Sequence, residues 1–197
     1  MKNKNFPLIL LLILGIETAW SACYPYDVQV WWTEFLTAFF FIVLLGTTYK
    51  KFRFSNLSYF IIFLFCFLQI IGAHYTFERV PFDAVTQFFG FTRNHYDRVA
   101  HFTIGLSGFL VSEFTWRKKI IPSFKWAAFF GIVFVMAMAN FWELVEWTYA
   151  EIDGGSAGLA FLGSQGDIWD AQKDMLMDTL GAIVACALFC WYFKRKK

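Results

Sequence analysis

Six apolar stretches separated by short polar segments dominate the sequence, and they leave little room for a fold outside a membrane. Most of them approach the roughly 20 residues that an α-helix needs to span the hydrocarbon core of a bilayer. The chain is 58% hydrophobic and 16% charged, whereas a soluble domain has about 25% charged residues. So much apolar surface cannot be buried inside one small globule, and lipid is therefore the expected solvent. The stretches cover residues 6–22, 34–49, 57–73, 97–115, 126–147 and 174–193.

We therefore predict a single all-α, polytopic membrane domain over residues 1–197 with about six transmembrane helices. A shorter segment at about residues 81–90 has apolar side chains at helical spacing, which predicts a helix lying flat on the membrane surface. Lys2 and Lys4 precede the first stretch as in a signal peptide, but the bulky Trp20 stands where cleavage requires a small residue. We expect this helix to stay uncleaved. The four cysteines show no metal-type spacing and are expected to be small apolar fillers without disulfides.

The basic residues predict how the chain is oriented. Thirteen of the seventeen lie at the N-terminus, in alternate loops or at the C-terminus, and four lie in the other loops. Short cytoplasmic loops carry an excess of lysine and arginine, so this asymmetry predicts that both termini are cytoplasmic. It also predicts an even number of crossings, which agrees with six. We expect the membrane to be a bacterial inner (plasma) membrane. The four basic residues of the outer loops are Arg79, Arg93, Arg98 and Lys173.

The acidic and histidine residues show the opposite distribution. Of the fifteen acids, only Glu113 lies near the cytoplasmic face, and the three histidines (His74, His95 and His101) all belong to the outer half. In three of the expected helices these groups share one side, because residues three or four positions apart lie on the same helix face. The rows are Asp97 and His101; Asn140, Glu143 and Glu146; and Asp170, Asp174 and Asp178.

Small residues continue two of these rows toward the membrane centre, and small residues let helices approach closely in lipid. They are Gly105, Gly108 and Ser112 in one row and Gly181, Ala182 and Ala185 in the other. A charge facing lipid at mid-membrane costs about 2.5–3.5 kcal/mol on insertion scales. Both effects turn the rows toward one another, so the last three helices are predicted to enclose a polar pocket that opens to the periplasm. Glu17 and Glu34, at the ends of the first two helices, could join its rim.

So many carboxylates cannot all ionise together without a counter-charge. A divalent cation could neutralise them, with carboxylates favouring Mg²⁺, Ca²⁺ or Mn²⁺ and histidine adding affinity for Zn²⁺. Arg93, Arg98 and Lys173 could pair with them instead, or some acids could stay protonated and relay protons. The candidate metal ligands are Asp97, His101, Glu143, Glu146, Asp174 and Asp178.

The leading functional hypothesis is a cation-assisted site that binds or acts on an envelope lipid or a small polar ligand. In an enzymatic version His101 or Glu143 would be the general base, but without a nucleophile motif the sequence leaves open whether the chain is an enzyme. One alternative is an ion- or proton-coupled transporter that uses the same acids. Another is a non-catalytic module whose polar cluster locks helix packing.

Membrane lipid is the expected partner, and neither a nucleotide nor a nucleic acid is expected. The sequence lacks the Gly-Lys-Ser/Thr motif of a phosphate-binding loop. The basic C-terminal residues 194–197 are interpreted as a topology signal that also meets anionic lipid.

Three spaced motifs resemble a known family. They are Asp97-x-x-x-His101-Phe102, Glu143-x-x-Glu146-Trp147 and Asp170-x-x-x-Asp174-x-x-x-Asp178-x-x-Gly181. This pattern resembles the YjdF-like family of bacterial inner-membrane proteins over nearly the whole chain. The resemblance implies an inner-membrane location and brings no established activity. More distantly, the order of the motifs is similar to VanZ-like membrane proteins, which are associated with tolerance of glycopeptide antibiotics and tend to carry Asn near the position of Asp178.

Overall fold

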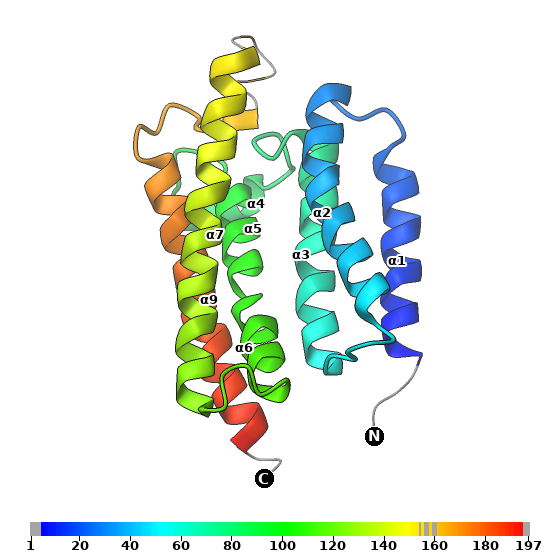
Figure 1. Ribbon diagram of the computed structural model, residues 1–197. Coiled ribbons are helices and arrows are strands. Elements are labelled where there is room, and N and C mark those ends of the chain that lie inside the picture. The colour runs from blue at the N-terminus through cyan, green and yellow to red at the C-terminus, as the bar shows by residue number, and fades with distance from the viewer. Residues whose placement is uncertain (1–4, 154, 156–157, 159–160, 195–197) are drawn as a thin grey trace.

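The computed structural model describes residues 5–153, 155, 158 and 161–194, and the regular structure in these ranges is helical throughout. The described chain begins and ends at the same end of the bundle, which we call the inner end; the opposite end is the outer end (Figure 1). This architecture confirms the prediction of an all-α fold. The helices are α1 (Phe6–Ser21), α2 (Val28–Thr48), α3 (Asn56–Tyr75), α4 (Asp83–Phe89), α5 (Tyr96–Gly105), α6 (Gly108–Arg117), α7 (Phe124–Asp153) and α9 (Asp170–Lys194).

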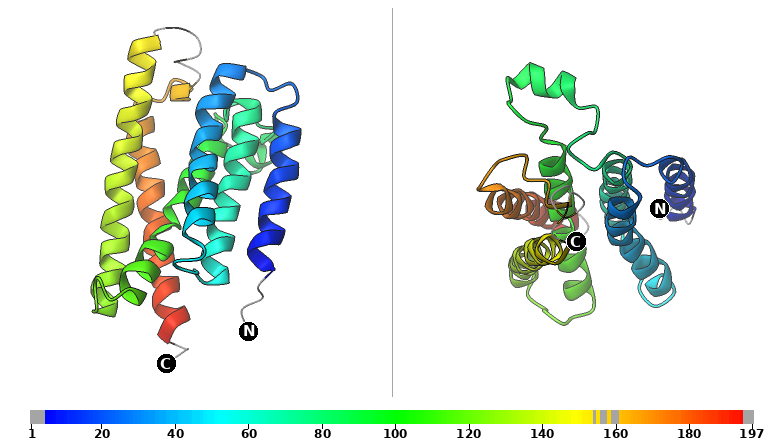
Figure 2. Two further views of the ribbon diagram at one scale, coloured as in Figure 1. Left: turned by 45° about the vertical axis from the view of Figure 1, so that its right-hand side comes forward. Right: turned by 90° about the horizontal axis from the view of Figure 1, so that it is seen from above.

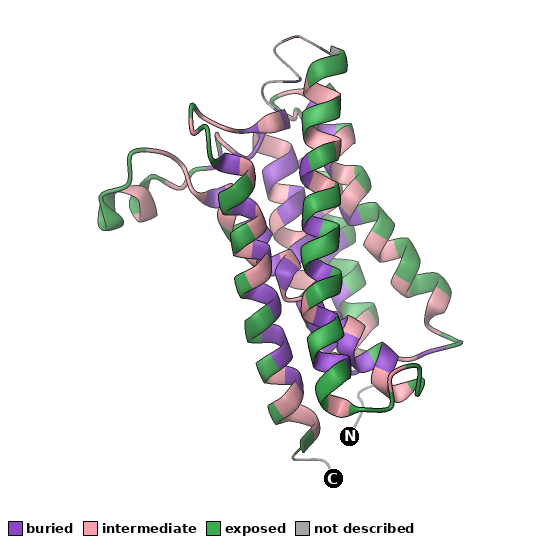
Figure 3. Cartoon of the chain, turned by 60° about the vertical axis from the view of Figure 1, so that its left-hand side comes forward, coloured by how far each residue is buried: buried purple, intermediate pink, exposed green. Residues whose placement is uncertain are grey.

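Within the described ranges, four helices are long and apolar enough to cross a membrane: α2, α3, α7 and α9. The helix α1 is also apolar but has only 16 residues. Exposed faces of the long helices lie on the outside of the bundle and buried faces inside (Figure 3). Large apolar side chains such as Phe129 and Phe141 of α7 are among the exposed ones, as expected of helices surrounded by lipid. The number of crossings and their direction stay predictions.

The helix α2 begins at Val28, earlier than the predicted start at residue 34, because Asp27 caps it. The Asp27 carboxylate accepts hydrogen bonds from the backbone N–H of Gln29 at 2.8 Å and of Val30 at 3.0 Å. These bonds satisfy N–H groups that a first helical turn leaves without helical partners. With 21 residues, α2 is long enough to span a bilayer. The predicted ranges 6–22, 57–73, 126–147 and 174–193 fall on α1, α3, α7 and α9.

The stretch predicted as one helix over residues 97–115 consists instead of two helices, α5 and α6, joined by a turn at Leu106 and Ser107. The N–H of Leu106 donates to the carbonyl of Thr103 at 3.2 Å, and that of Ser107 donates to Ile104 at 2.8 Å. Bonds across three residues instead of four tighten the backbone into a 3₁₀ turn. Because a glycine flanks each side of this turn, the regular helix is also intrinsically weak there. Only both helices together are long enough to cross a bilayer.

The bundle consists of two groups of helices. In the first group α1 and α2 both pack on α3, and in the second group α5, α6, α7 and α9 pack together. The groups meet where α3 contacts α5, and they stand next to each other in the views from the side and from above (Figure 2). All three polar rows expected from the sequence lie in the second group, on α5, α7 and α9.

The short helix α4 projects sideways from the bundle (Figure 2). It has seven residues, none of them buried. The side chain of Phe88 is 82% exposed and that of Phe89 is 62% exposed. A helix is thus present inside the predicted range 81–90, and its outward aromatic side chains suit a position on a membrane surface. That position stays a prediction.

Glu113 of α6 fastens the second group to α3 at the inner end. Its carboxylate accepts hydrogen bonds from the N–H of Ser55 at 2.9 Å and from the Ser58 hydroxyl at 2.5 Å. Arg117, one turn further along α6, pairs with the same carboxylate. The Glu113 side chain is fully buried, and these partners offset the cost of burying its charge. The acid that the sequence places alone in the inner half therefore serves helix packing.

Candidate functional site

The helices α5 and α9 approach each other so closely that their backbones touch. A Cβ atom added to Gly105 would clash with the carbonyl oxygen of Asp178, and one added to Gly181 would clash with that of Phe102. Ala182, on the same side of α9, is fully buried. The small residues singled out in the sequence thus form the helix contact. This contact brings polar side chains on the next turns of α5 and α9 within reach of one another.

His101 of α5 lies at the centre of the resulting cluster. Its Nδ1 lies 3.0 Å from Oδ2 of Asp178 on α9, and its Nε2 lies 3.7 Å from Oδ1 of Asp97, one turn earlier on α5. His101 is only 7% exposed. A carboxylate that accepts a hydrogen bond from one ring nitrogen leaves the lone pair of the other nitrogen available to a metal or a proton.

Asp174 of α9 joins this pair of residues from one turn closer to the outer end. Asp97, His101 and Asp174 each offer a ligand atom, and these atoms lie within 4.8 Å of one another. Oδ1 of Asp174 and Oδ1 of Asp178 are buried without a hydrogen-bond partner in the part of the chain that the structure describes. Buried polar atoms are nearly always partnered in folded proteins, so these two oxygens mark a place that suits a ligand.

The helix α7 contributes two acids to the cluster instead of the three polar groups expected. Glu143 is buried, its charge interacts with that of His101, and its Oε1 has no hydrogen-bond partner among the described residues. The carboxylate of Glu146 accepts a hydrogen bond from the indole N–H of Trp142 at 2.5 Å. Asn140 is exposed, because each step of three residues rotates the side chain by about 60° around an α-helix.

The structure also brings Glu34 of α2 to the cluster. Glu34 is 5% exposed and accepts a hydrogen bond from the Gln69 side chain at 2.8 Å. Its charge interacts with those of Asp97 and His101. The sequence places Glu34 only at the rim, although an acid inside an apolar stretch is itself a signal for an inward-facing side chain. Glu17 of α1 is also buried, and its carboxylate oxygens have no hydrogen-bond partner within the described ranges.

The other two histidines lie outside the cluster. The ring of His74 stacks on Trp20 with 4.5 Å between centroids, and its Nδ1 lies 2.9 Å from the backbone oxygen of Ser21. The ring of His95 packs edge-on against Phe91 at 4.4 Å. Of the three histidines in the outer half, His101 is therefore the one that lies in the acidic cluster.

A layer of ion pairs covers the cluster at the outer end. Arg98 lies 2.8 Å from Asp167 and 3.0 Å from Asp170. Arg93 pairs with the same two acids, and Lys173 lies 2.6 Å from Asp167. Hydrogen bonds from Lys173 and Arg98 hold the pKa of the Asp167 carboxyl well below its usual range. The three basic residues that the sequence suggested as counter-charges thus pair mainly with Asp167 and Asp170.

The loop before α9 forms a roof that is held by the segment before α5. The side chain of Gln165 makes two bonds with the backbone of Asn94, accepting from its N–H at 3.1 Å and donating to its carbonyl at 3.0 Å. Arg93 donates to the carbonyls of Ser164 at 3.0 Å and Gly163 at 3.3 Å. Glycine suits this turn, since Gly163 has a φ of +61°.

The balance of charge differs between the two layers. In the outer layer three cations face Asp167 and Asp170. In the inner layer the ring nitrogens of His101 face Asp97 and Asp178, and Asp174 lies in the same group. The charges of Glu143 and Glu146 interact with that of His101. The nearest guanidinium nitrogen of Arg98 lies 3.6 Å from Asp174. The inner layer therefore has the excess of oxygen donors that a divalent cation requires.

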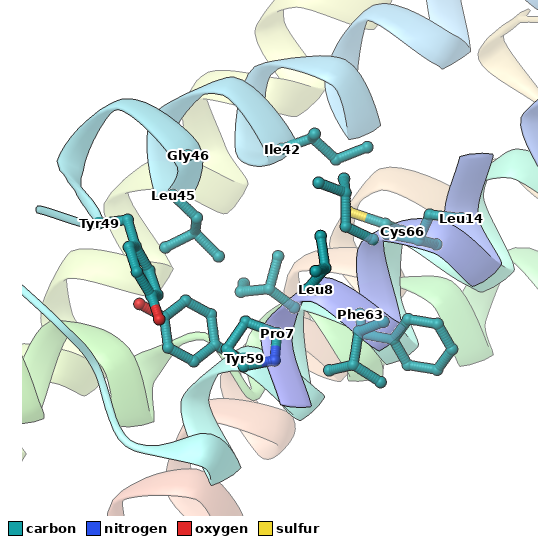
Figure 4. A pocket seen from close by; sticks show the side chains of 13 residues that line it. Pro7, Leu8, Leu14, Ile42, Leu45, Gly46, Tyr49, Tyr59, Phe63 and Cys66 are labelled. Carbon is teal, nitrogen blue, oxygen red and sulfur yellow. The ribbon is translucent and has the colours of Figure 1, made fainter. Parts of the chain in front are cut away.

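An apolar cavity of about 410 Å³ lies elsewhere, among α1, α2 and α3 (Figure 4). None of the predicted site residues lines it. Between α5, α7 and α9, where the sequence predicts a polar pocket, the structure has a cluster of polar side chains. The opening of a pocket to the periplasm stays a prediction.

Comparison with known proteins decides the family. A family described as "Predicted membrane protein (DUF2238)" matches residues 6–195. The chain belongs to this family. It is 33% identical over 181 residues to the inner membrane protein YjdF of Escherichia coli (strain K12), a match that covers 91% of this chain and 85% of that protein. No solved structure matches the chain significantly.

These matches confirm the YjdF-like resemblance seen in the sequence motifs. The chain is an inner-membrane protein, as predicted. The similarity to VanZ-like proteins, the metal ligands and any activity stay predictions.

Proposed function

We propose that this chain crosses the inner membrane six times, with both termini in the cytoplasm, and holds at its periplasmic end a divalent cation that helps it bind or act on the polar head group of an envelope lipid. The path of the chain supports six crossings when α5 and α6 count as one. The inner end carries the α2–α3 and α6–α7 connections, which together with the adjoining ends of α6 and α7 contain seven of the twelve basic residues that the structure describes. Basic connections are characteristic of the cytoplasmic side.

The observation that carries the cation site is the grouping of Asp97, His101 and Asp174, whose ligand atoms lie within 4.8 Å of one another. Ligands around one ion are about 4 Å or less apart, so small side-chain movements are enough to bring them together. Three protein ligands with a position left for water or substrate are the arrangement of catalytic metal sites. Mixed nitrogen and oxygen donors suit Zn²⁺ or Mn²⁺ as well as Mg²⁺.

The contacts of His101 suggest roles for the other acids. Asp178 holds Nδ1 of His101, so it orients the imidazole, while Nε2 faces the proposed ion. With both ring nitrogens used in this way, Glu143 is the better candidate for a general base, because its Oε1 is unpartnered among the described residues. A bound divalent cation would polarise an oxygen of the head group.

The inner half of the bundle disfavours the transporter alternative. A path through the membrane requires polar groups along its length. In the inner half, Glu113 is committed to Ser55, Ser58 and Arg117. The structural-module alternative differs from the proposal in one measurable respect, because it requires no metal at all.

Elemental analysis of protein purified without chelators tests the proposal. We expect a stoichiometric divalent metal in the unmodified protein and its loss in the double variant Asp97→Asn/Asp174→Asn. Asp83→Asn, an exposed acid of α4, is the matched control and should keep the metal. A folded protein that never contains metal would establish the structural module. Proton or cation flux in proteoliposomes would establish the transporter instead.

A further inference from the structure

The apolar cavity among α1, α2 and α3 is a second candidate binding site, separate from the acidic cluster. The helices α1 and α2 both pack on α3 but hardly contact each other, so α3 forms the floor of the cavity between them. Its volume of about 410 Å³ lies within the roughly 300–1,000 Å³ typical of ligand pockets. Its lining is apolar apart from a few groups such as the hydroxyls of Tyr49 and Tyr59.

The cavity runs from the inner end of the bundle toward its middle. Figure 4 shows Tyr49 and Tyr59 at one end of it and Leu14 and Cys66 at the other. Leu8, which also lines the cavity, is 57% exposed, so the cavity borders the space that lipid would fill. The cleft is long and apolar, and it has hydroxyl groups at the end nearer the membrane surface. This distribution of polarity matches that of a lipid, which has an apolar chain and a polar head group.

Positive charge lies at the tyrosine end. Lys50 and Lys51 directly follow Tyr49 and are both exposed. The guanidinium group of Arg53 lies over the ring of Tyr49 at 5.3 Å. Basic side chains next to a membrane-spanning helix attract anionic lipid head groups. We infer that this cavity holds an acyl chain of an anionic phospholipid from the leaflet at the inner end, with its phosphate at Lys50 and Lys51.

Native mass spectrometry of the full chain in detergent, titrated with dioleoyl-phosphatidylglycerol or with zwitterionic dioleoyl-phosphatidylcholine, tests the inference. Gly46→Leu places a side chain in the cavity without a clash, since nothing lies within 4 Å of a Cβ added there. Each displaced methylene weakens binding about fourfold, so a leucine that displaces two of them should weaken binding of both lipids about 15-fold. Gly15→Leu is the matched control, because its surroundings are equally open and it lies outside the cavity lining.

A second pair of variants tests the head group. Lys50→Gln/Lys51→Gln should weaken binding of phosphatidylglycerol by up to about 30-fold and leave that of phosphatidylcholine unchanged. Lys125→Gln/Lys194→Gln removes the same charge from the inner ends of α7 and α9, and should change the binding of neither lipid.

Equal affinity for the two lipids in the unmodified protein would overturn the inference that the head group is anionic. Unchanged binding in Gly46→Leu would overturn the cavity, as would a second copy of the chain bound in place of lipid. If Gly46→Leu does not fold, the smaller Gly46→Ala tests the cavity in its place, and it should weaken binding of both lipids about fourfold.

Discussion

The carbonyl oxygen of Asp178 lies against Gly105, so that α5 and α9 touch without a side chain between them. The carboxylate of the same residue holds the imidazole of His101. Helix packing and the polar cluster therefore meet at one residue, Asp178. A change that separates these two helices also pulls His101 away from its partner.

Replacing Gly105 with alanine should destabilise the protein by about 1–3 kcal/mol, because the added methyl group needs the space of the Asp178 carbonyl. Thermal unfolding in detergent, followed by circular dichroism, measures this effect. Gly15→Ala is the control, since nothing lies within 4 Å of a Cβ added at Gly15. Similar unfolding temperatures for both variants would mean that the backbones of α5 and α9 do not touch at Gly105.

Glu113→Gln should destabilise the protein by about 1–3 kcal/mol, because it weakens the hydrogen bonds to the buried carboxylate and leaves the partly exposed guanidinium group of Arg117 without its charged partner. Ser58→Ala removes one hydrogen bond to the same carboxylate and should cost about 1–3 kcal/mol. Chemical denaturation in mixed micelles measures both changes in the free energy of unfolding. Metal content per folded protein should be unaffected, because Glu113 lies at the other end of the bundle. Loss of metal in folded Glu113→Gln would contradict the separation of the two clusters.

Much of the polar cluster could be predicted from the sequence for a simple physical reason. Charges are costly in lipid, so acids spaced by four residues in apolar stretches must face the protein interior. This argument places Asp97, His101, Asp174 and Asp178 together, as the structure does. It says less about α7, where the rotation of the helix decides which polar residue points inward, and Asn140 is exposed.

Other features depend on contacts between distant segments, which local patterns do not reveal. The pairing of Asn94 with Gln165 joins two loops that are 71 positions apart in the chain. The turn at Leu106 and Ser107 divides a stretch whose composition alone favours one helix. Glu34 reaches the cluster only because the two helix groups pack together through α3 and α5.

The roof should be insensitive to pH over the neutral range. The pKa of Asp167 is lower in the folded protein because of Lys173 and Arg98. An acid with a lowered pKa stabilises the fold above its unfolded pKa of about 3.9, and this contribution is lost as the pH falls through the folded value. Hydrogen exchange in the 163–167 loop should therefore stay constant from about pH 8 to about pH 5, after correction for intrinsic rates, and rise only in strong acid.

Asp167→Asn tests the same roof at neutral pH. Losing the ion pairs with Arg98 and Lys173 should speed up exchange in the loop at neutral pH and remove the further rise in acid. Asp83→Asn again provides the control. Exchange that changes near neutral pH in the unmodified protein would show that a group other than Asp167 controls the docking of the loop.

Variants of Asp178 and Asp174 should separate orientation from direct metal binding. Asp178→Asn keeps the size of the side chain but weakens its hold on Nδ1 of His101, and loss of such an orienting partner lowers metal affinity about 10–100-fold. Asp174→Asn removes a proposed ligand and should lower the affinity further. Titration of metal-free protein with Zn²⁺ or Mn²⁺ by calorimetry measures both. If the two variants lose affinity equally, Asp178 is itself a ligand, and if Asp178→Asn binds metal normally, the contact between His101 and Asp178 serves packing alone.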